Sequence, residues 1–452
     1  MPDTPSPIRN WSDSLETRPA ALARPTSVEE VVEIVRDRAR YPSPLRPMGS
    51  YHSTTACAVA DGGTLVDMRG LNRVLEITET RVRAEAGAEY IDVAEALRAR
   101  GLEFHVALEI GNITLGSAAC CATKDGSYPG EAGQAGAFVS AVRMVDAEGE
   151  LVEIGEDQPE LFRALRSSYG LMGVIVEVTF RVRRAKPVAV VHRNYSTQAF
   201  LDALPELRAR EGSLAFYIFP FADRITAQLR GPAKARAWRN PFVWRVRNFG
   251  VAYAVPLFVR ALALVPGRGL RLAVMRAFDA MSRLLLALTL RARSTRASDQ
   301  ITRYRYRPKL ACFTFNIWAF PEQDYPDTLR AYQTFCRAHL EVHGYRPELL
   351  TVGYRVSPSQ HALLSYSFEG PVLTIDPVGF AGPDWDRFNA AFNIFCHSHG
   401  GKPLLNQSPA LTPEQVEAAF GERLAQQRAA VREGDPSGRF TNPHFARLLR
   451  LD

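Results

Sequence analysis

The sequence lacks the features that would mark an exported or metal-binding protein. The first residues contain neither a basic stretch nor the apolar core of a signal peptide, so we expect a cytoplasmic protein. The six cysteines form no CxxC pair and show no metal-ligand spacing. They are therefore predicted to be reduced thiols, and no metal site is expected.

A Rossmann nucleotide motif and a membrane-spanning run are also missing. No GxGxxG follows a predicted strand and opens a helix, so a Rossmann dinucleotide site is not supported. Prolines or charges interrupt the two most apolar stretches, 251–265 and 270–290, before they reach the roughly 18 residues of a spanning helix. With 452 residues, of which 46% are apolar and 23% charged, the chain is predicted to form two or three soluble globular domains.

Acidic residues are nearly absent from the segment 230–296, which we call the basic insertion. It contains 13 arginines and Lys234 but a single acid, Asp279. Apolar stretches edged by arginines predict a segment that lies on an anionic membrane surface, at the inner face of the membrane. The alternative is a set of helices that pack on the protein and hold their arginines in solvent. Nucleic-acid binding is not expected, because the apolar faces need burial and no recognition motif is present.

The spacing of apolar residues predicts a mixed α+β protein. In the N-terminal half, short strands and hairpins alternate with predicted helices over 27–39, 91–100 and 159–168. Beyond Pro187, the order strand–helix–strand–strand–helix predicts an antiparallel sheet covered by helices. A last helix is expected to begin at Thr412-Pro413.

Four stretches of the chain, taken together and in this order, form a recognisable pattern. They are "LRPMGSYHS" (45–53), "GNITLGSAA" (111–119), "GLMG" (170–173) and "DPSGRFTNPHFARLL" (435–449). Together they resemble the PCMH-type FAD domain of the vanillyl-alcohol oxidase / p-cresol methylhydroxylase superfamily. Within it, the chain is most similar to sugar-1,4-lactone oxidases, such as D-arabinono-1,4-lactone oxidase and L-gulonolactone oxidase, and to alditol oxidases. "ASDQI" (297–301) is similar to a further landmark of that group.

The resemblance implies three parts of the chain. Residues 1–186 would form a two-subdomain FAD-binding domain, and residues 187–407 a substrate-binding cap domain that carries the basic insertion. Residues 408–452 would return to the FAD domain.

The resemblance also implies which residues bind FAD. A diphosphate needs backbone N–H groups that approach closely, which favours glycine and small residues in tight turns. The implied FAD-binding residues are Pro47, Met48, Gly49, Ser50, Tyr51, His52, Ser53, Gly111, Asn112, Ile113, Thr114, Gly116, Ser117, Thr123, Gly173, Ile175 and Asn442. His52 stands where many relatives bond a histidine to the flavin 8α-methyl group, which implies covalent FAD. The alternative is a histidine that only hydrogen-bonds near the flavin ring.

The implied catalytic residues are Arg355, Gln407 and Thr114. Arg355 would stabilise the reduced flavin, and the other two would orient the substrate. The chain departs from the pattern here, because Gly353 and Gln407 occupy the usual glutamate and lysine positions.

Two further observations concern proton transfer on this side of the flavin. Lys124 and Asp125 replace a usual His-Gly pair beside the flavin. The candidate bases that remain are His397, His399, Tyr354 and Tyr366, and the sequence does not choose among them.

These features predict a flavoenzyme that oxidises a C–OH group by hydride transfer to flavin N5, with reoxidation by O2 or another acceptor. The default small-molecule substrate is a sugar lactone or polyol. One alternative is a membrane-associated oxidation or desaturation of a lipidic or specialised metabolite. Another is a catalytically degenerate protein that binds flavin or a partner.

Overall fold

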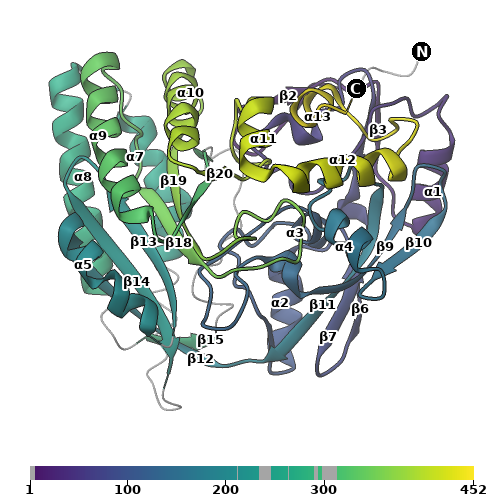
Figure 1. Cartoon of the computed structure of the whole chain (residues 1–452), viewed down its shortest axis with the longest axis horizontal. Coiled ribbons are helices and arrows are strands. Elements are labelled where there is room, and N and C mark those ends of the chain that lie inside the picture. The colour runs from purple at the N-terminus through teal and green to yellow at the C-terminus, as the bar shows by residue number, and fades with distance from the viewer. Residues whose placement is uncertain are drawn as a thin grey trace.

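The computed structural model describes residues 6–210, 212–233, 246–262, 264–289, 294–297 and 313–451. Most of the arginine-rich flank of the basic insertion and residues 298–301 of the "ASDQI" stretch lie outside these ranges. Figure 1 shows two lobes side by side, with the two ends of the chain together in one of them. We call that lobe the flavin lobe and the other the cap lobe.

The flavin lobe contains two main sheets. The smaller is parallel, in the order β3 (Ala21–Ala23), β5 (Thr64–Asp67), β4 (Leu45–Met48). The larger is antiparallel and centres on β11 (Val174–Arg184), the β-branched strand that the sequence predicts. Its other members are β6 (Val74–Ile77), β7 (Arg81–Glu85), β8 (Leu102–Phe104), β9 (Val139–Val145) and β10 (Leu151–Gly155). The short strands β1 (Ile8–Arg9) and β2 (Glu16–Thr17) pair with each other.

The helices of the flavin lobe follow the sequence closely, with one addition. The predicted helices are α1 (Val28–Arg36), α2 (Tyr90–Ala99) and α4 (Pro159–Leu165). Ser27 caps α1 by accepting a hydrogen bond from the backbone N–H of Glu30. The Gly/Ala-rich stretch after Gly111 contains α3 (Leu115–Cys120), a short helix that the sequence did not predict.

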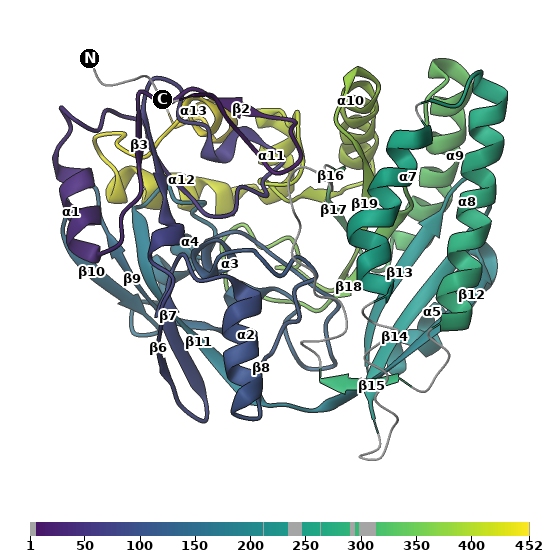
Figure 2. The same ribbon diagram turned by 180° about the vertical axis from the view of Figure 1, so that it is seen from behind.

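The cap lobe is a nine-stranded antiparallel sheet, as the sequence predicts. Its main order is β15 (Ser294–Ala297), β12 (Pro187–Ser196), β14 (Arg224–Pro232), β13 (Ser213–Phe219), β18 (Thr351–Val356), β19 (Val372–Phe380), β17 (Trp318–Pro321) and β20 (Lys402–Pro403), with β16 (Phe313–Phe315) paired to β19. One face packs against α5 (Thr197–Ala209), α9 (Tyr325–His343) and α10 (Pro383–Ser398). The π-turn over Gly250–Ala254, α7 (Val255–Leu262) and α8 (Arg268–Thr289) lie on the opposite side, nearest the viewer in Figure 2.

The C-terminal segment returns to the flavin lobe as three helices, yellow in Figure 1. They are α11 (Pro413–Phe420), α12 (Glu422–Gly434) and α13 (Pro443–Leu449). Thr412 and Gln415 form a capping box at the predicted helix start. The sequence predicts one long helix here, but Gly421 adopts a φ of 51° and divides it into α11 and α12.

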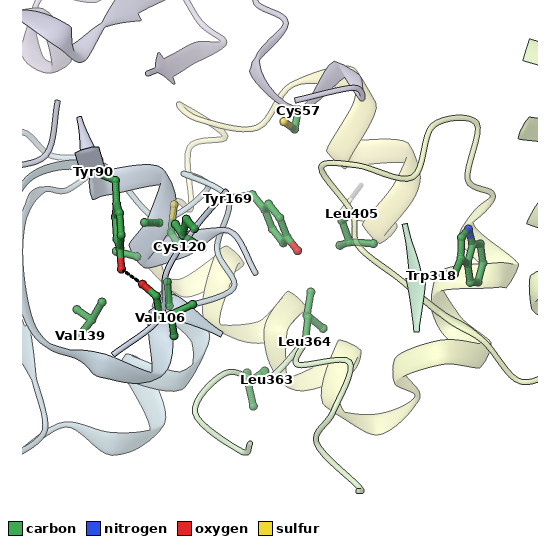
Figure 3. Packing of buried hydrophobic residues seen from close by; sticks show 14 of the residues in the cluster. Cys57, Tyr90, Val106, Cys120, Val139, Tyr169, Trp318, Leu363, Leu364 and Leu405 are labelled. Carbon is green, nitrogen blue, oxygen red and sulfur yellow. Dashed lines mark hydrogen bonds between the residues drawn. The ribbon is translucent and has the colours of Figure 1, made fainter. Parts of the chain in front are cut away.

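One hydrophobic core runs through both lobes. Figure 3 shows Tyr90 and Tyr169 of the flavin lobe in the same cluster as Leu364 and Trp318 of the cap lobe. Tyr90 donates a hydrogen bond to the backbone oxygen of Val106 at 2.8 Å, so its buried hydroxyl group is satisfied. The lobes are therefore packed together and not merely tethered.

A buried arginine joins segments that are far apart in the sequence. Arg46 of β4 is 1% exposed and donates hydrogen bonds to the backbone oxygens of Cys57 (2.8 Å), Tyr169 (2.5 Å), Gly170 (3.1 Å) and Phe440 (2.7 Å). These carbonyls belong to the turn after β4, to the 169–173 turn and to the C-terminal segment. A guanidinium group, with its five donors in a fixed plane, is the side chain best able to satisfy so many acceptors at once.

We expect Arg46→Met to lower the free energy of unfolding by about 3 kcal/mol or more, because several buried carbonyls lose their donor. Chemical denaturation measures this loss. Arg439→Met is the matched control, since Arg439 is also buried and donates to backbone oxygens, but of Ile34, Val35 and Tyr41. Both variants should be destabilised, and only Arg46→Met should also lose FAD. Equal FAD content in the two variants would contradict a role of Arg46 in positioning the predicted FAD-binding segments.

Candidate active site

A cavity of about 680 Å³ lies between the lobes and is lined by residues of both. It contains most of the residues that the sequence predicts for FAD and substrate. These are Pro47, Met48, Gly49, Ser50, Tyr51, His52, Ser53, Ile113, Thr114, Gly116, Ser117, Thr123, Gly173, Ile175 and Gln407. Three of the four stretches singled out in the sequence, 45–53, 111–119 and 170–173, therefore meet at one place.

The turn after β4 presses against the start of α3. A Cβ atom added to Gly49 would lie 2.2 Å from Oγ1 of Thr114, so only glycine allows this approach. The Ser50 hydroxyl donates a hydrogen bond to the backbone oxygen of Asn112, which fixes the same contact. At the other side, Gly173 adopts a φ of 150°, and a Cβ there would lie 2.6 Å from the backbone oxygen of Val145. At both places, glycine allows the backbone of the cavity wall to pack closely against a neighbouring segment.

His52 is held in a defined orientation at the cavity. Tyr51 adopts a φ of 55°, a left-handed conformation that is uncommon for a non-glycine residue. Nε2 of His52 lies 2.9 Å from Oδ1 of Asn112, and the indole ring of Trp11 lies 4.9 Å from the imidazole between ring centroids. Burial lowers the pKa of His52 to about 4, against the opposing effect of the Asn112 hydrogen bond. The imidazole is therefore neutral at physiological pH.

Several buried polar atoms at the cavity have no hydrogen-bond partner among the described residues. They are Oη of Tyr51, Oγ1 of Thr123, Oδ1 of Asp376, Oδ1 of Asn406 and Oε1 of Gln407. A buried polar atom without a partner costs about 1–3 kcal/mol, so such a set fits a ligand with many donors and acceptors. FAD has such groups on its ribityl chain and on one side of its flavin ring. Together with the glycine turns, these residues fit FAD.

Three of the predicted FAD-binding residues do not line the cavity. Gly111 packs on Ile91, and Asn112 acts through His52. Asn442 caps α13 and donates hydrogen bonds to the backbone oxygens of Ala56 (2.9 Å) and Val59 (2.8 Å). Asn442 therefore fastens the C-terminal segment to the turn over Ala56–Val59, outside the cavity wall, and its contact with FAD stays a prediction.

The side chain of Arg355 points away from the cavity. It forms an ion pair with Glu322 at 2.7 Å, on the sheet face that packs against helices. Gly353 lies on the same face, where a Cβ would lie 2.1 Å from the ring of Phe216, so that a glutamate would not fit. Side chains alternate along a strand, and the cavity side of β18 is therefore formed by Val352 and Tyr354. Neither Gly353 nor Arg355 lines the cavity, and the catalytic role that the resemblance implies for Arg355 stays a prediction.

Most of the predicted bases also lie elsewhere. His397 and His399 stand at the end of α10, where His397 is exposed and His399 half-buried, and neither lines the cavity. Tyr366 is buried but does not line the cavity either. Tyr354 does, and its hydroxyl donates a hydrogen bond to Oε2 of Glu109 at 2.8 Å.

The sequence analysis missed a charged pair in the cavity wall. Nζ of Lys124 lies 2.6 Å from Oδ2 of Asp376, with both side chains at most 5% exposed. The same ammonium group lies 4.1 Å from the centroid of the Tyr354 ring. The available signal was the single charge in "VLTIDPVGF", the otherwise apolar strand that becomes β19.

The cap side of the cavity is mostly apolar. Its lining includes Val246, Phe278, Leu285, Leu286, Phe313, Phe315, Leu349, Leu350 and Val378. Phe278 of α8 stacks on Phe258 of α7 with the ring centroids 4.3 Å apart. Asp279, the one acid of the basic insertion, is buried in an ion pair with Arg346 at 2.9 Å. This pair ties α8 to the loop between α9 and β18 and leaves arginine as the charged residue on the exposed side of α8.

Apolar side chains also cover the outside of α7 and α8. Those that are at least half exposed are Leu257, Leu264, Leu270, Met281, Leu284 and Leu285. Arg260, Arg268, Arg271 and Arg276 are exposed beside them. We call this surface the leucine–arginine face. In the ranges given above, no helix is both long and apolar enough to cross a membrane.

Comparison with known proteins agrees with this geometry. Residues 19–155 match a family model described as an FAD binding domain, and residues 178–448 match one described as D-arabinono-1,4-lactone oxidase. The chain is 24% identical to L-gulono-1,4-lactone dehydrogenase of Mycobacterium tuberculosis, over 98% of this chain and 99% of that protein. It is likewise 24% identical to L-gulonolactone oxidase of Bos taurus, over 98% of each.

Solved structures support the fold. A cholesterol oxidase from B. sterolicum superposes with a TM-score of 0.80, at 15% sequence identity and over 99% of both chains. The α+β architecture of the chain is thus shared with that structure. The family match spans the cap lobe and the C-terminal helices, and the flavin match spans the turn that carries His52. The chain is an FAD-dependent oxidoreductase that belongs to the D-arabinono-1,4-lactone oxidase family.

Proposed function

We propose that this protein oxidises a hydroxyl group of a small molecule at FAD that is bound covalently to His52. The observation that carries the proposal is the meeting of the glycine turns, His52 and the unpartnered polar atoms in one cavity between the lobes. Bound FAD supplies a two-electron acceptor that takes a hydride from carbon. The turns over 47–53 and 113–117 would hold its diphosphate and ribityl chain.

His52 is suited to covalent attachment because its ring is neutral and fixed. A protonated imidazole has no lone pair with which to form a bond to carbon, and burial keeps this ring neutral. Asn112 at Nε2 and the Trp11 ring restrict its rotation. Gln407 donates a hydrogen bond to the backbone oxygen of His52 at 3.1 Å, so this residue would stand near the attached edge of the flavin.

The family makes a sugar 1,4-lactone or polyol the first candidate substrate. The apolar cap side of the cavity favours a second candidate, an amphipathic alcohol with one polar end. Leu285 and Val246 line the cavity and are each about half exposed, at 50% and 51%, so this apolar part of the cavity meets the leucine–arginine face. The electron acceptor would be O2 or another oxidant.

The experiment that tests this function is anaerobic mixing of the purified yellow protein with a panel of alcohols. We expect L-gulono-1,4-lactone, D-arabinono-1,4-lactone, sorbitol or a long-chain alcohol to bleach the flavin absorbance, because hydride transfer reduces the ring. A colourless protein, or a flavin that no member of the panel reduces, would favour a protein without this activity. Bleaching by the long-chain alcohol alone would select the second candidate.

We expect acid precipitation to leave the yellow colour in the pellet of the wild-type protein and in the supernatant of His52→Ala. The physical reason is that only a covalent bond keeps flavin on the denatured chain. Trp11→Phe is the control, since it retains an aromatic ring beside His52. Complete release of flavin from the wild-type protein would refute attachment at His52.

We further propose that the leucine–arginine face rests on an anionic membrane surface. Apolar side chains exposed between arginines are suited to a headgroup layer, where each arginine contributes about 1 kcal/mol. This would place the protein at the cytoplasmic side of a membrane, with the apolar part of the cavity toward the lipid.

Sedimentation with lipid vesicles tests this surface. We expect binding to vesicles that contain phosphatidylglycerol, and about fivefold weaker binding for each of Arg271→Gln and Arg276→Gln, from about 1 kcal/mol per charge. Leu284→Ser should weaken it through lost apolar contact. Val342→Ser is the matched control, because Val342 is 75% exposed on α9, outside this face. Failure of the wild-type protein to bind these vesicles would contradict the proposal.

A further inference from the structure

The Lys124–Asp376 pair lies in the cavity wall, where the two lobes meet. Asp376 lies on β19 opposite Val352 of β18, on the side of the sheet that faces the cavity. Lys124 comes from the flavin lobe, directly after Thr123, which also lines the cavity. The ion pair therefore bridges the two lobes at the wall between the flavin-binding turns and the apolar cap side.

The two oxygens of Asp376 have different surroundings. Oδ2 receives the ammonium group of Lys124 at 2.6 Å. Oδ1 is buried and has no hydrogen-bond partner among the described residues. This oxygen has almost no accessible surface, so a donor of the ligand would reach it only after a local side-chain movement; it could then accept that hydrogen bond.

The other carboxylates of the cavity are engaged differently. Glu109 accepts the Tyr354 hydroxyl at 2.8 Å and lies 3.6 Å from Arg230. Asp279 is paired with Arg346 beside α8, at the apolar cap side. Neither has a side-chain oxygen among the unpartnered buried atoms. Of the cavity carboxylates, Asp376 is thus the one that presents such an oxygen.

We propose that Asp376 accepts the hydroxyl proton of the substrate, and that Lys124 is a positioning residue that holds the Asp376 carboxylate. The proposal rests on the proposed function. As the substrate C–H bond breaks and its hydride passes to FAD, the O–H proton moves to Oδ1 of Asp376 and a C=O bond forms. Asp376 then releases this proton to water, and the electron acceptor of the enzyme removes the two electrons. This assigns the proton to a residue that the sequence analysis did not consider.

The electrostatics of the site suit a base. Burial raises the pKa of the Asp376 carboxyl, while Lys124 opposes this and keeps the anion accessible. A carboxylate whose pKa is raised toward the working pH is a better proton acceptor than an ordinary one. The ionisable and hydrogen-bonding groups that act on it are Lys124, Thr374, Glu109, Tyr325, Tyr354 and Tyr366.

The first test is Asp376→Asn, which keeps the shape of the side chain but cannot accept a proton. In anaerobic stopped-flow mixing with the panel of alcohols, we expect flavin reduction to slow by about 10²-fold or more, with FAD content unchanged. The wild-type rate should rise with pH through the pKa of Asp376, because the base must be ionised. That rise should be absent in Asp376→Asn. In Lys124→Met it should move to higher pH, since loss of the positive charge raises the pKa of Asp376.

Asp376→Asn leaves Lys124 buried without its counter-ion, which destabilises the fold apart from any effect on proton transfer. The double variant Asp376→Asn/Lys124→Met removes both charges and should show the same slow reduction. Glu348→Gln is the matched control, because Glu348 is a part-buried carboxyl outside the cavity. Reduction of Asp376→Asn and of the double variant at the wild-type rate would overturn the proposal.

Infrared titration gives a readout that needs no substrate. We expect a protonated-carboxyl band that titrates in the wild-type protein and in Glu348→Gln but is missing from Asp376→Asn. Absence of any band assignable to Asp376 would overturn the proposal even if the alcohols reduce the flavin. If no alcohol reduces the wild-type flavin but the band is present, the proposed function fails and the ionisable Asp376 stands.

Discussion

The buried guanidinium of Arg46 is the interaction on which the flavin lobe depends. It binds backbone oxygens of the turn after β4, of the 169–173 turn and of the C-terminal segment. These segments are separated by more than a hundred residues in the chain, and each contributes to the cavity or supports it. A hydrophobic side chain could fill the same space, but it could not determine where four carbonyl groups point. Arg46 therefore links the Ala56–Ala58 turn, which follows the His52 stretch, to these distant segments.

The cavity has a polar wall on the flavin side and an apolar wall on the cap side. On the flavin side, glycine and small residues allow backbone segments to approach one another closely, and several buried oxygens have no hydrogen-bond partner among the described residues. On the cap side, the walls are aromatic and aliphatic. The Lys124–Asp376 pair lies between them and places a buried ion pair in the cavity wall. Selectivity for one hydroxyl group would arise at that boundary.

The cofactor half of this protein was largely predictable from sequence, and the substrate half was not. Tight turns need glycine at fixed positions, so "MGSYHS" and "NITLGS" carry their geometry in the residue types themselves. The residue types of a strand do not show which of its faces points to the cavity, because a register shift of one residue moves every side chain to the opposite face of the sheet. The resemblance implied a role at the flavin for Arg355, whereas in the structure Glu322 adjoins Arg355 and Phe216 adjoins Gly353 on the helix side of β18. The Lys124–Asp376 contact joins residues 252 positions apart, and sequence spacing alone does not indicate it.

The hydrophobic core that the two lobes share restricts how a substrate can reach the cavity and how a product can leave it. Tyr169, Leu364, Leu405 and Trp318 belong to one cluster, so swinging the lobes apart as rigid bodies would expose that cluster to water. Hinge bending is thus the costly route to the cavity. Val246 and Leu285 line the cavity and are each about half exposed, so the edge of α8 is where the cavity meets the surface. The helices α7 and α8 would then both border the cavity entrance and contact the membrane. The rate of product release would therefore depend on membrane binding.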